Sequence, residues 1–207
     1  MNLRLKTLAI VLVGLLPITV NATDCSFYGK NWQRFSNLQL GISFCYPPKF
    51  LIKTEGQDIY VLTKPSAQHT KRLLSQNNTD LLFNGKRMLE PSNYVVHIKV
   101  ARGDFNAANH KESIFVKDKG VVRPNIGRFG NGPAQAISGI GWFGYKAKIS
   151  CSTSDSQTGF HAAGGECLWI VGSDGRHNFV LDTLGDPTDA ILAWKIAKSL
   201  CLLQSHR

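Results

Sequence analysis

The feature that most constrains the fold is the run Tyr94–Val100, in which bulky apolar side chains occupy every second position. A period of two indicates a β-strand, because successive side chains of a strand point to opposite faces. The apolar members of one predicted face are Tyr94, Val96, Ile98 and Val100. His97 falls on the opposite, more polar face together with Val95 and Lys99, so the sequence predicts a strand that is buried on one side.

Shorter apolar runs on both sides of this strand predict further strands. They cover Ile42–Tyr46, Leu51–Lys53, Ile59–Thr63, Trp142–Ser150, Cys167–Val171 and Asn178–Thr183. Pro47-Pro48 ends the first of them, and Ser173-Asp174-Gly175 predicts a turn before the last. Asn84-Gly85 indicates a tight turn between two apolar runs, and either strands or short helices can flank it.

Two helices and one long loop complete the predicted elements. Gln68–Gln76 is a predicted helix, and a second begins near Pro187, where Asp186 or Thr188 can cap it. Apolar residues recur at helical spacing from Ala190 to Leu203 and include Cys201, which predicts a core thiol or a hidden disulfide there. Val121–Pro133 is rich in Gly and Pro and is expected to be an exposed loop, within the polar segment from Arg102 to Gly132.

These elements predict the α+β class, with an antiparallel sheet flanked by helices and the C-terminal helix packed on the sheet. The segment Gly41–Phe50, Gly-Ile-Ser-Phe-Cys-Tyr-Pro-Pro-Lys-Phe, resembles the opening strand of PsbP-like domains. Lys198-Ser199-Leu200 is similar to the end of their final helix, although Phe50 stands where those domains more often have Trp. The resemblance implies a PsbP-like sandwich with a binding or accessory role, and it carries over no functional residue.

The first residues have the composition of a secretory signal peptide. Arg4 and Lys6 precede the apolar stretch Leu8–Val20, and small residues lead to Ala22. We therefore predict a cleaved signal peptide over residues 1–22 and a single periplasmic domain over residues 23–207. The apolar stretch is shorter than the roughly 20 residues that span a bilayer, so no integral membrane segment is expected after cleavage.

All five cysteines follow this segment, and an exported protein is free to oxidise them. Because five is odd, at least one thiol is unpaired or pairs with another chain. Cys151 and Cys167 flank a predicted loop and are expected to pair across a hairpin. Cys25 and Cys45 form a second candidate pair that leaves Cys201 spare, and Cys25–Cys201 is the rival pairing. The spacing Cys-x-x-Cys does not occur, so no metal site is expected.

The chain carries a net charge of +10, which favours a partner with an acidic face. Its basic residues are scattered in short pairs such as Lys71-Arg72 and Lys86-Arg87. A nucleic-acid-binding protein would concentrate them in one tract, often with interleaved aromatic residues. The sequence therefore predicts a protein partner and no nucleic acid.

No catalytic motif is recognisable. Ser138 lacks the flanking glycines of a Gly-x-Ser-x-Gly elbow, and Gly127–Gly132 lacks the Lys-Ser/Thr of a phosphate-binding loop. Each histidine, His97 included, is expected to be structural or solvated, because none has a ligand spacing such as His-x-x-x-His. The acidic residues are few, and nothing in the sequence singles out a catalytic pair. We expect no enzyme and no cofactor.

The candidate binding residues lie in or beside the predicted exposed loop. They are Arg123, Asn125, Arg128, Phe129 and Asn131. Arginine and aromatic side chains on such a loop suit a binding hot spot, although an ordinary surface loop is the alternative. The resulting hypothesis is a non-catalytic periplasmic immunity or inhibitor protein that neutralises a secreted toxin or cell-wall hydrolase. Two alternatives remain open, an accessory subunit of an envelope complex and a hydrolase whose site is assembled from distant residues.

Overall fold

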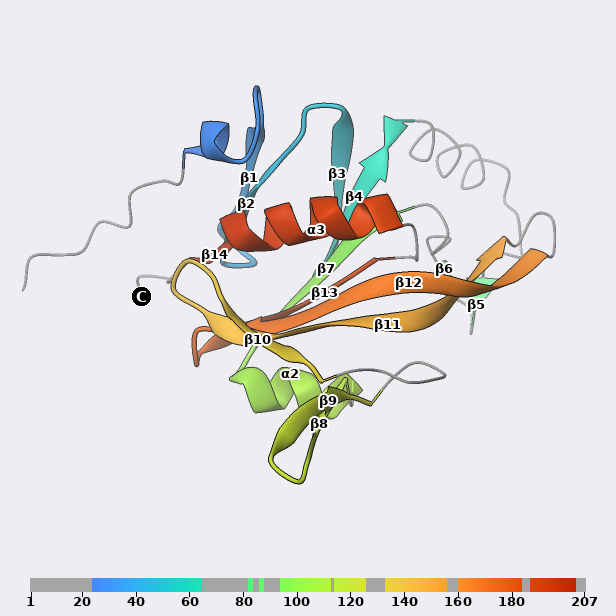
Figure 1. The fold of residues 1–207 in the computed structure, drawn as a ribbon. Helices are drawn as coiled ribbons and strands as arrows, with labels where there is room; N and C mark the ends of the chain where they lie inside the picture. The colour runs from blue at the N-terminus through green and yellow to red at the C-terminus, as the bar shows by residue number, and fades with distance from the viewer. Residues whose placement is uncertain are drawn as a thin grey trace, which may run out of the picture.

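The computed structural model describes residues 24–64, 82–83, 86–87, 94–112, 114–125, 133–155, 160–183 and 187–203. Its centre is a seven-stranded antiparallel sheet in the order β10-β11-β12-β13-β7-β4-β3, shown in Figure 1. These strands are β3 (Phe50–Glu55), β4 (Asp58–Thr63), β7 (Tyr94–Arg102), β10 (Gln135–Ser138), β11 (Phe143–Asp155), β12 (Phe160–Ser173) and β13 (His177–Asp182). All six predicted strands and the strand at Tyr94–Val100 are thereby confirmed, with Ile42–Tyr46 in a separate small sheet.

Two helices lie on opposite faces of the large sheet (Figure 1). Helix α3 (Pro187–Ser199) packs against β12, β7 and β13, and the shorter helix α2 (Phe105–Glu112) packs against β12 and β13 on the other side. We call these the α3 face and the α2 face. The α3 face holds the larger core, whose fully buried side chains include Ile59, Val61, Val96, Ile98, Leu181 and Ile196. The α2 face holds a smaller core that includes Ile114, Phe115, Ile149 and Val180.

A three-stranded sheet in the order β1-β2-β14 closes the end of α3. Its strands are β1 (Gln33–Asn37), β2 (Ile42–Tyr46) and β14 (Cys201–Leu202). Ile42 to Cys45 are all buried, because β2 lies between two strands and also contacts α3. The Ser199 hydroxyl fixes this junction, since it accepts the Cys45 N–H at 2.8 Å and donates to the Ile196 carbonyl at 2.7 Å.

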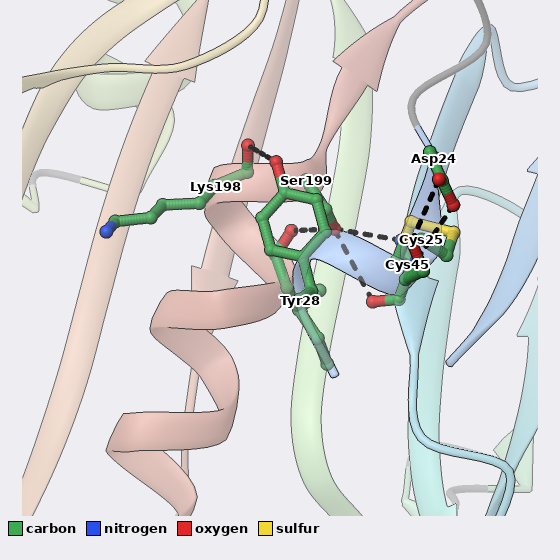
Figure 2. The surroundings of a disulfide bond; sticks show 8 residues. Asp24, Cys25, Tyr28, Cys45, Lys198 and Ser199 are labelled. Carbon is green, nitrogen blue, oxygen red and sulfur yellow. Dashed lines mark hydrogen bonds between the residues drawn. A yellow bond between two sulfur atoms is a disulfide. The ribbon is translucent and has the colours of Figure 1, made fainter. Parts of the chain in front are cut away.

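A disulfide between Cys25 and Cys45 ties the N-terminal 3-10 turn η1 (Cys25–Phe27) to β2, as Figure 2 shows. This pairing confirms one predicted disulfide and excludes the rival Cys25–Cys201. Tyr28 adds a second tie, because its hydroxyl donates to the Lys198 carbonyl at 3.0 Å. Cys201 is a free, buried thiol, as one of the two sequence interpretations expected.

For the second predicted disulfide, Cys151–Cys167, the structure describes the side chain of only one cysteine. Cys167 is disulfide-bonded. The side chain of Cys151 lies outside the described part of the structure, so the Cys151–Cys167 pairing remains a prediction. The loop expected between the two cysteines was wrong in extent, because β11 and β12 continue as paired strands to Asp155 and from Phe160. In this register Cys151 lies opposite Gly165, and Ile149 lies opposite Cys167.

The segment from Arg102 to Gly132 is more ordered than the sequence predicted. It contains α2 and a hairpin of β8 (Phe115–Asp118) and β9 (Val121–Pro124). The expected loop over Val121–Pro133 was therefore wrong for its first four residues. The hairpin forms because Lys119 and Gly120 both have positive φ, 46° and 85°, as a two-residue turn with the twist of the strands requires.

The C-terminal helix is shorter than predicted. α3 ends at Ser199, and Cys201–Leu202 form β14 beside β2. The predicted stripe to Leu203 was wrong beyond Ser199, because the last apolar residues extend the small sheet. The predicted helix Gln68–Gln76 lies outside the described residues. The flanks of the predicted Asn84-Gly85 turn pair as strands, β5 (Leu82–Phe83) with β6 (Lys86–Arg87).

The predicted signal peptide, residues 1–22, also lies outside the described residues and remains a prediction. Among the helices that are described, none is long and apolar enough to cross a membrane.

Candidate functional site

A groove of about 790 Å³ opens on the α2 face, where α2, the β8–β9 hairpin and the β10–β11 edge of the sheet meet. We call it the α2 groove. Its wall is aromatic, because the Tyr145 ring on β11 lies edge-on to Phe105 of α2 with centroids 5.5 Å apart. Phe115 of β8 also contacts Tyr145, with ring centroids 6.2 Å apart. Three separate elements thus place three aromatic rings against one another and form one wall of this groove.

The rim of the α2 groove carries exposed apolar side chains. Phe143 at the start of β11 is 59% exposed, and Val116 of β8 is 39% exposed. Scattered apolar residues are normal on protein surfaces, but a contiguous group around a concavity is characteristic of binding sites. This rim is therefore an apolar contact surface with a ready-made recess.

Basic side chains lie on the hairpin side of this apolar surface. Lys117 lines the groove, and Lys119 and Arg123 are exposed on the same hairpin. The acidic groups nearby are Asp118 on the hairpin and Asp104 at the start of α2. Asp104 accepts the Ala107 N–H at 2.9 Å and thereby caps the helix. The hairpin side of the groove is consequently net positive.

The structure places one of the predicted binding residues in the lining of this groove. Asn125 lines the groove, whereas Arg123 lies exposed on the neighbouring strand β9 and is not part of the lining. Two backbone hydrogen bonds of 2.8 Å hold the chain on either side of the stretch between β9 and β10. The Asn125 N–H donates to the Ile114 carbonyl, and the Ala134 N–H donates to the Val122 carbonyl. The other three predicted residues, Arg128, Phe129 and Asn131, lie outside the described residues.

Sequence reasoning missed the aromatic residues of the groove. Phe143 and Tyr145 were placed in a predicted strand without a role, and Phe105 fell in the polar segment from Arg102 to Gly132 without a predicted element. One signal was available, because Phe143 and Tyr145 are two residues apart and must share a face of their strand. No sequence signal places α2 and the hairpin against that face.

A second cluster of functional side chains spans β4, β7 and β13 on the same face of the sheet. His97 lies between two carboxylates, with Nδ1 2.8 Å from Asp182 Oδ2 and Nε2 2.9 Å from Asp58 Oδ1. The Tyr94 hydroxyl donates to Asp182 Oδ1 at 2.7 Å. Tyr60 stacks on the imidazole, with centroids 4.9 Å apart and planes at 18°. We call this set the His97 network.

Strand register explains how these residues meet. Tyr60 and Asp182 lie opposite His97 on the two neighbouring strands. Tyr94 joins them through a register shift, since Val61 pairs with Val96 whereas Leu62 pairs with Tyr94. The predicted face of Tyr94 was therefore wrong, because the extra residue, Val95, turns into the core of the α3 face.

The surrounding charges set the protonation of the network. Burial alone would lower the pKa of His97, but the hydrogen bonds and charges of Asp182 and Asp58 outweigh burial and raise it above its usual value. Burial and the neighbouring carboxylates raise the pKa of Tyr60 to about 12, and burial together with Asp182 raises that of Tyr94 strongly. The two carboxylates thus favour the charged form of His97, in which both ring N–H groups donate to carboxylates.

This arrangement is unsuited to catalysis by His97. A general base needs a free ring nitrogen within reach of the proton it removes, and both nitrogens of His97 are occupied. Ser138, the nearest match to a nucleophile elbow, lies exposed on β10 at the opposite end of the strand order from β4. Among the described residues, no group of three or more His, Cys, Asp or Glu side chains could hold a metal ion. The His97 network is a satisfied polar cluster that cross-links three strands.

The sequence matches no family model and no curated protein. Solved structures similar to this chain include a protein of Bacteroides thetaiotaomicron VPI-5482, with a TM-score of 0.46 and 10% identity over 84% of this chain. The match covers only 50% of that protein's length. Another is cyanobacterial PsbP from Synechocystis sp. PCC 6803, with a TM-score of 0.42 and 12% identity over 83% of this chain and 92% of that one.

A third is the Saccharomyces cerevisiae Ran-binding protein Mog1p, with a TM-score of 0.39 and 8% identity over 84% of this chain and 97% of that one. A PsbP structure is thus among those similar to this chain.

Proposed function

We propose that this chain is a non-catalytic protein-binding module whose α2 groove, together with the predicted binding residues Arg123, Asn125, Arg128, Phe129 and Asn131, binds an acidic protein partner. The observation that carries the proposal is the exposed apolar rim of Phe143 and Val116 around an aromatic recess. Interfaces place apolar and aromatic residues at their centre and polar residues around them. The α2 groove with its basic hairpin has this composition.

The positive charge beside the α2 groove favours an acidic partner. The chain has a net charge of +10, and Lys117, Lys119 and Arg123 concentrate positive charge beside the groove. Complementary charge accelerates association and disfavours wrong partners. A partner with an apolar side chain that enters the groove and carboxylates that face the hairpin fits these two properties together.

Within this class we favour a periplasmic immunity or inhibitor protein that blocks a secreted toxin or cell-wall hydrolase. Export is supported by the predicted signal peptide and by the Cys25–Cys45 disulfide, because disulfides persist in oxidising compartments. A basic surface with an apolar anchor is also suited to the acidic cleft of a hydrolase that cuts cell-wall polymers.

Affinity capture with matched variants tests the proposal. The oxidised chain from Thr23 is immobilised as wild type, as Phe143→Glu and as Leu38→Glu, and envelope and secreted proteins of the source organism are passed over each. Leu38 is 81% exposed in the turn between β1 and β2, so its variant adds the same charge away from the α2 groove.

We expect one stoichiometric protein on the wild type and on Leu38→Glu, and its loss on Phe143→Glu. Equal capture by Phe143→Glu would remove the α2 groove from the proposal. A captured enzyme whose activity falls on binding supports the inhibitor role, whereas a captured set of envelope subunits without inhibition supports the accessory role.

A further inference from the structure

A second groove, of about 660 Å³, lies on the α3 face between α3 and the β10–β11 edge of the sheet. It lies beside α3, which packs mainly over β12, β13 and β7, with β11 next to β12 at the edge of this packing. Its apolar surface comes from Leu168 of β12 and from Ala190, Ile191 and Trp194 of α3. Ile191 is 64% exposed, so an apolar side chain of the helix faces solvent at this groove. We call it the Trp194 groove.

Lysines gather at one side of the Trp194 groove. The Lys146 ammonium lies 3.8 Å from the centre of the Trp194 ring, and Lys198 lies 5.3 Å from the same centre. Lys148 follows Lys146 by two residues on the same face of β11 and also lines the groove. Contact with an aromatic ring stabilises an ammonium group and fixes its position. Lys146 and Lys198 are thus held near one ring.

One of these three lysines has a carboxylate partner among the described residues. Lys148 pairs with Glu166. Within the described part of the chain, neither Lys146 nor Lys198 forms an ion pair with a carboxylate. Burial lowers the pKa of Lys146, and the nearby charges of Lys198 and Lys148 lower it further. A bound anion at this position would relieve the repulsion among the ammonium groups.

We propose that the Trp194 groove binds a single-chain anionic amphiphile, a long-chain carboxylate, with the chain along Ile191, Ala190 and Leu168 and the carboxylate beside Lys146 and Lys198. The volume lies within the range of small-molecule sites, which combine mainly apolar linings with a few polar groups that fix orientation. Along Leu168 the only cation of the lining, Lys148, is neutralised by Glu166, whereas Lys146 and Lys198 lie at the Trp194 ring without a carboxylate partner among the described residues. This arrangement matches a ligand that is apolar along its length and negative at one end. This site is independent of the partner proposed for the α2 groove.

Titration of the mature oxidised chain with dodecanoate, below the concentration at which it forms micelles, tests the proposal. Binding is followed by tryptophan fluorescence, and Trp194→Phe identifies the signal of the groove. Dodecanol supplies the chain without the charge, and acetate supplies the charge without the chain. We expect saturable binding of dodecanoate alone, because only it satisfies both halves of the groove.

The decisive variants are Lys146→Gln and Lys195→Gln. Lys195 is exposed on the same helix and does not line the groove, so it controls for the loss of one charge from α3. Lys146→Gln should weaken dodecanoate about tenfold, the usual order for one charge-assisted contact, and Lys195→Gln should leave it unchanged. Ile191→Ser should also weaken it, and its exposure makes a loss of folding unexpected.

Equal weakening by both lysine variants, or equal binding of dodecanol, would overturn the proposal. Tighter binding of an acidic, leucine-containing peptide than of dodecanoate would reassign the groove to a protein partner. Sedimentation with anionic vesicles in the absence of monomer binding would reassign it to a membrane surface.

Discussion

The two faces of the seven-stranded sheet are covered in different ways, and the difference separates stability from recognition. On the α3 face, Ile98, Leu181 and Ile196 have no solvent exposure and belong to one continuous core. On the α2 face, the core under α2 is smaller, and the sheet beyond it carries the His97 network. Where the short helix and the hairpin leave the face uncovered, it presents the α2 groove.

The α2 groove exists because α2 and the β8–β9 hairpin cover only part of their face of the sheet. A long helix buries a sheet face and leaves little of it to bind a partner, and the groove of about 660 Å³ on the α3 face lies beside α3, at the β10–β11 edge of the sheet. A short helix and a two-stranded hairpin bury enough apolar surface to be held in place and leave aromatic side chains partly exposed. Four experiments test this difference between the two faces.

The largest expected effect is a cavity on the α3 face. Ile98→Ala should lower the free energy of unfolding by about 4 kcal/mol, because a fully buried side chain is lost where neighbours relax little. Val122→Ala, at a partly buried site of the hairpin, should cost about 1 kcal/mol or less. Urea unfolding of both variants measures the contrast, and equal losses would show that the two faces contribute alike.

The next effect concerns the His97 network. Asp182→Ala should destabilise the chain by roughly 3 kcal/mol, since it leaves a largely buried imidazolium and the Tyr94 hydroxyl without their acceptor. Asp58→Ala should cost about 1 kcal/mol, because the Asp58 side chain is 31% exposed and water replaces it. The same unfolding assay compares them, and a larger loss for Asp58→Ala would contradict the assigned roles.

A smaller effect is expected in the pH dependence of stability. Because the folded pKa of His97 is raised above its unfolded value of about 6.5, its charge stabilises the fold fully below that pH and less as pH rises through the folded pKa. The stability difference between wild type and His97→Gln should therefore be largest near pH 5 and shrink above neutrality. Urea midpoints across this pH range give the curve, and a difference that grows with pH would refute a charged His97.

The smallest effect on stability is expected in the α2 groove itself. Phe143→Ser should change the free energy of unfolding by no more than about 0.5 kcal/mol, because Phe143 is 59% exposed. A loss above 2 kcal/mol in the same assay would mean that Phe143 is a core residue and would weaken its assignment to recognition.

Sequence reasoning located the strands well and the site poorly, for physical reasons. The period of two in Tyr94–Val100 and Ile59–Thr63 follows from strand geometry and needs no tertiary information. Helix α2 was missed because Phe105–Glu112 contains one large apolar residue, and its cap, Asp104, is short-range and easily overlooked. The β8–β9 turn was missed because Lys119-Gly120 differs from the usual Asn-Gly.

The His97 network depends on strand pairings that no periodic pattern in the sequence predicts. Asp58, His97 and Asp182 were each visible as polar residues, but only the register of three strands brings them together. A single extra residue at Val95 moves Tyr94 to the face of His97, and alternation alone predicts the opposite. Arg123 and Asn125 are exposed, as expected for Arg and Asn in a Gly- and Pro-rich segment, and their binding role remains a prediction.

Hydrogen–deuterium exchange of the full mature chain, with and without the captured partner, directly tests whether the α2 groove is the recognition site. We predict slower exchange on binding in α2, in the β8–β9 hairpin and at the start of β11 near Phe143, with β3 and β4 unchanged. Protection confined to β3, β4 or α3, with the α2 face unaltered, would contradict a recognition site at the α2 groove.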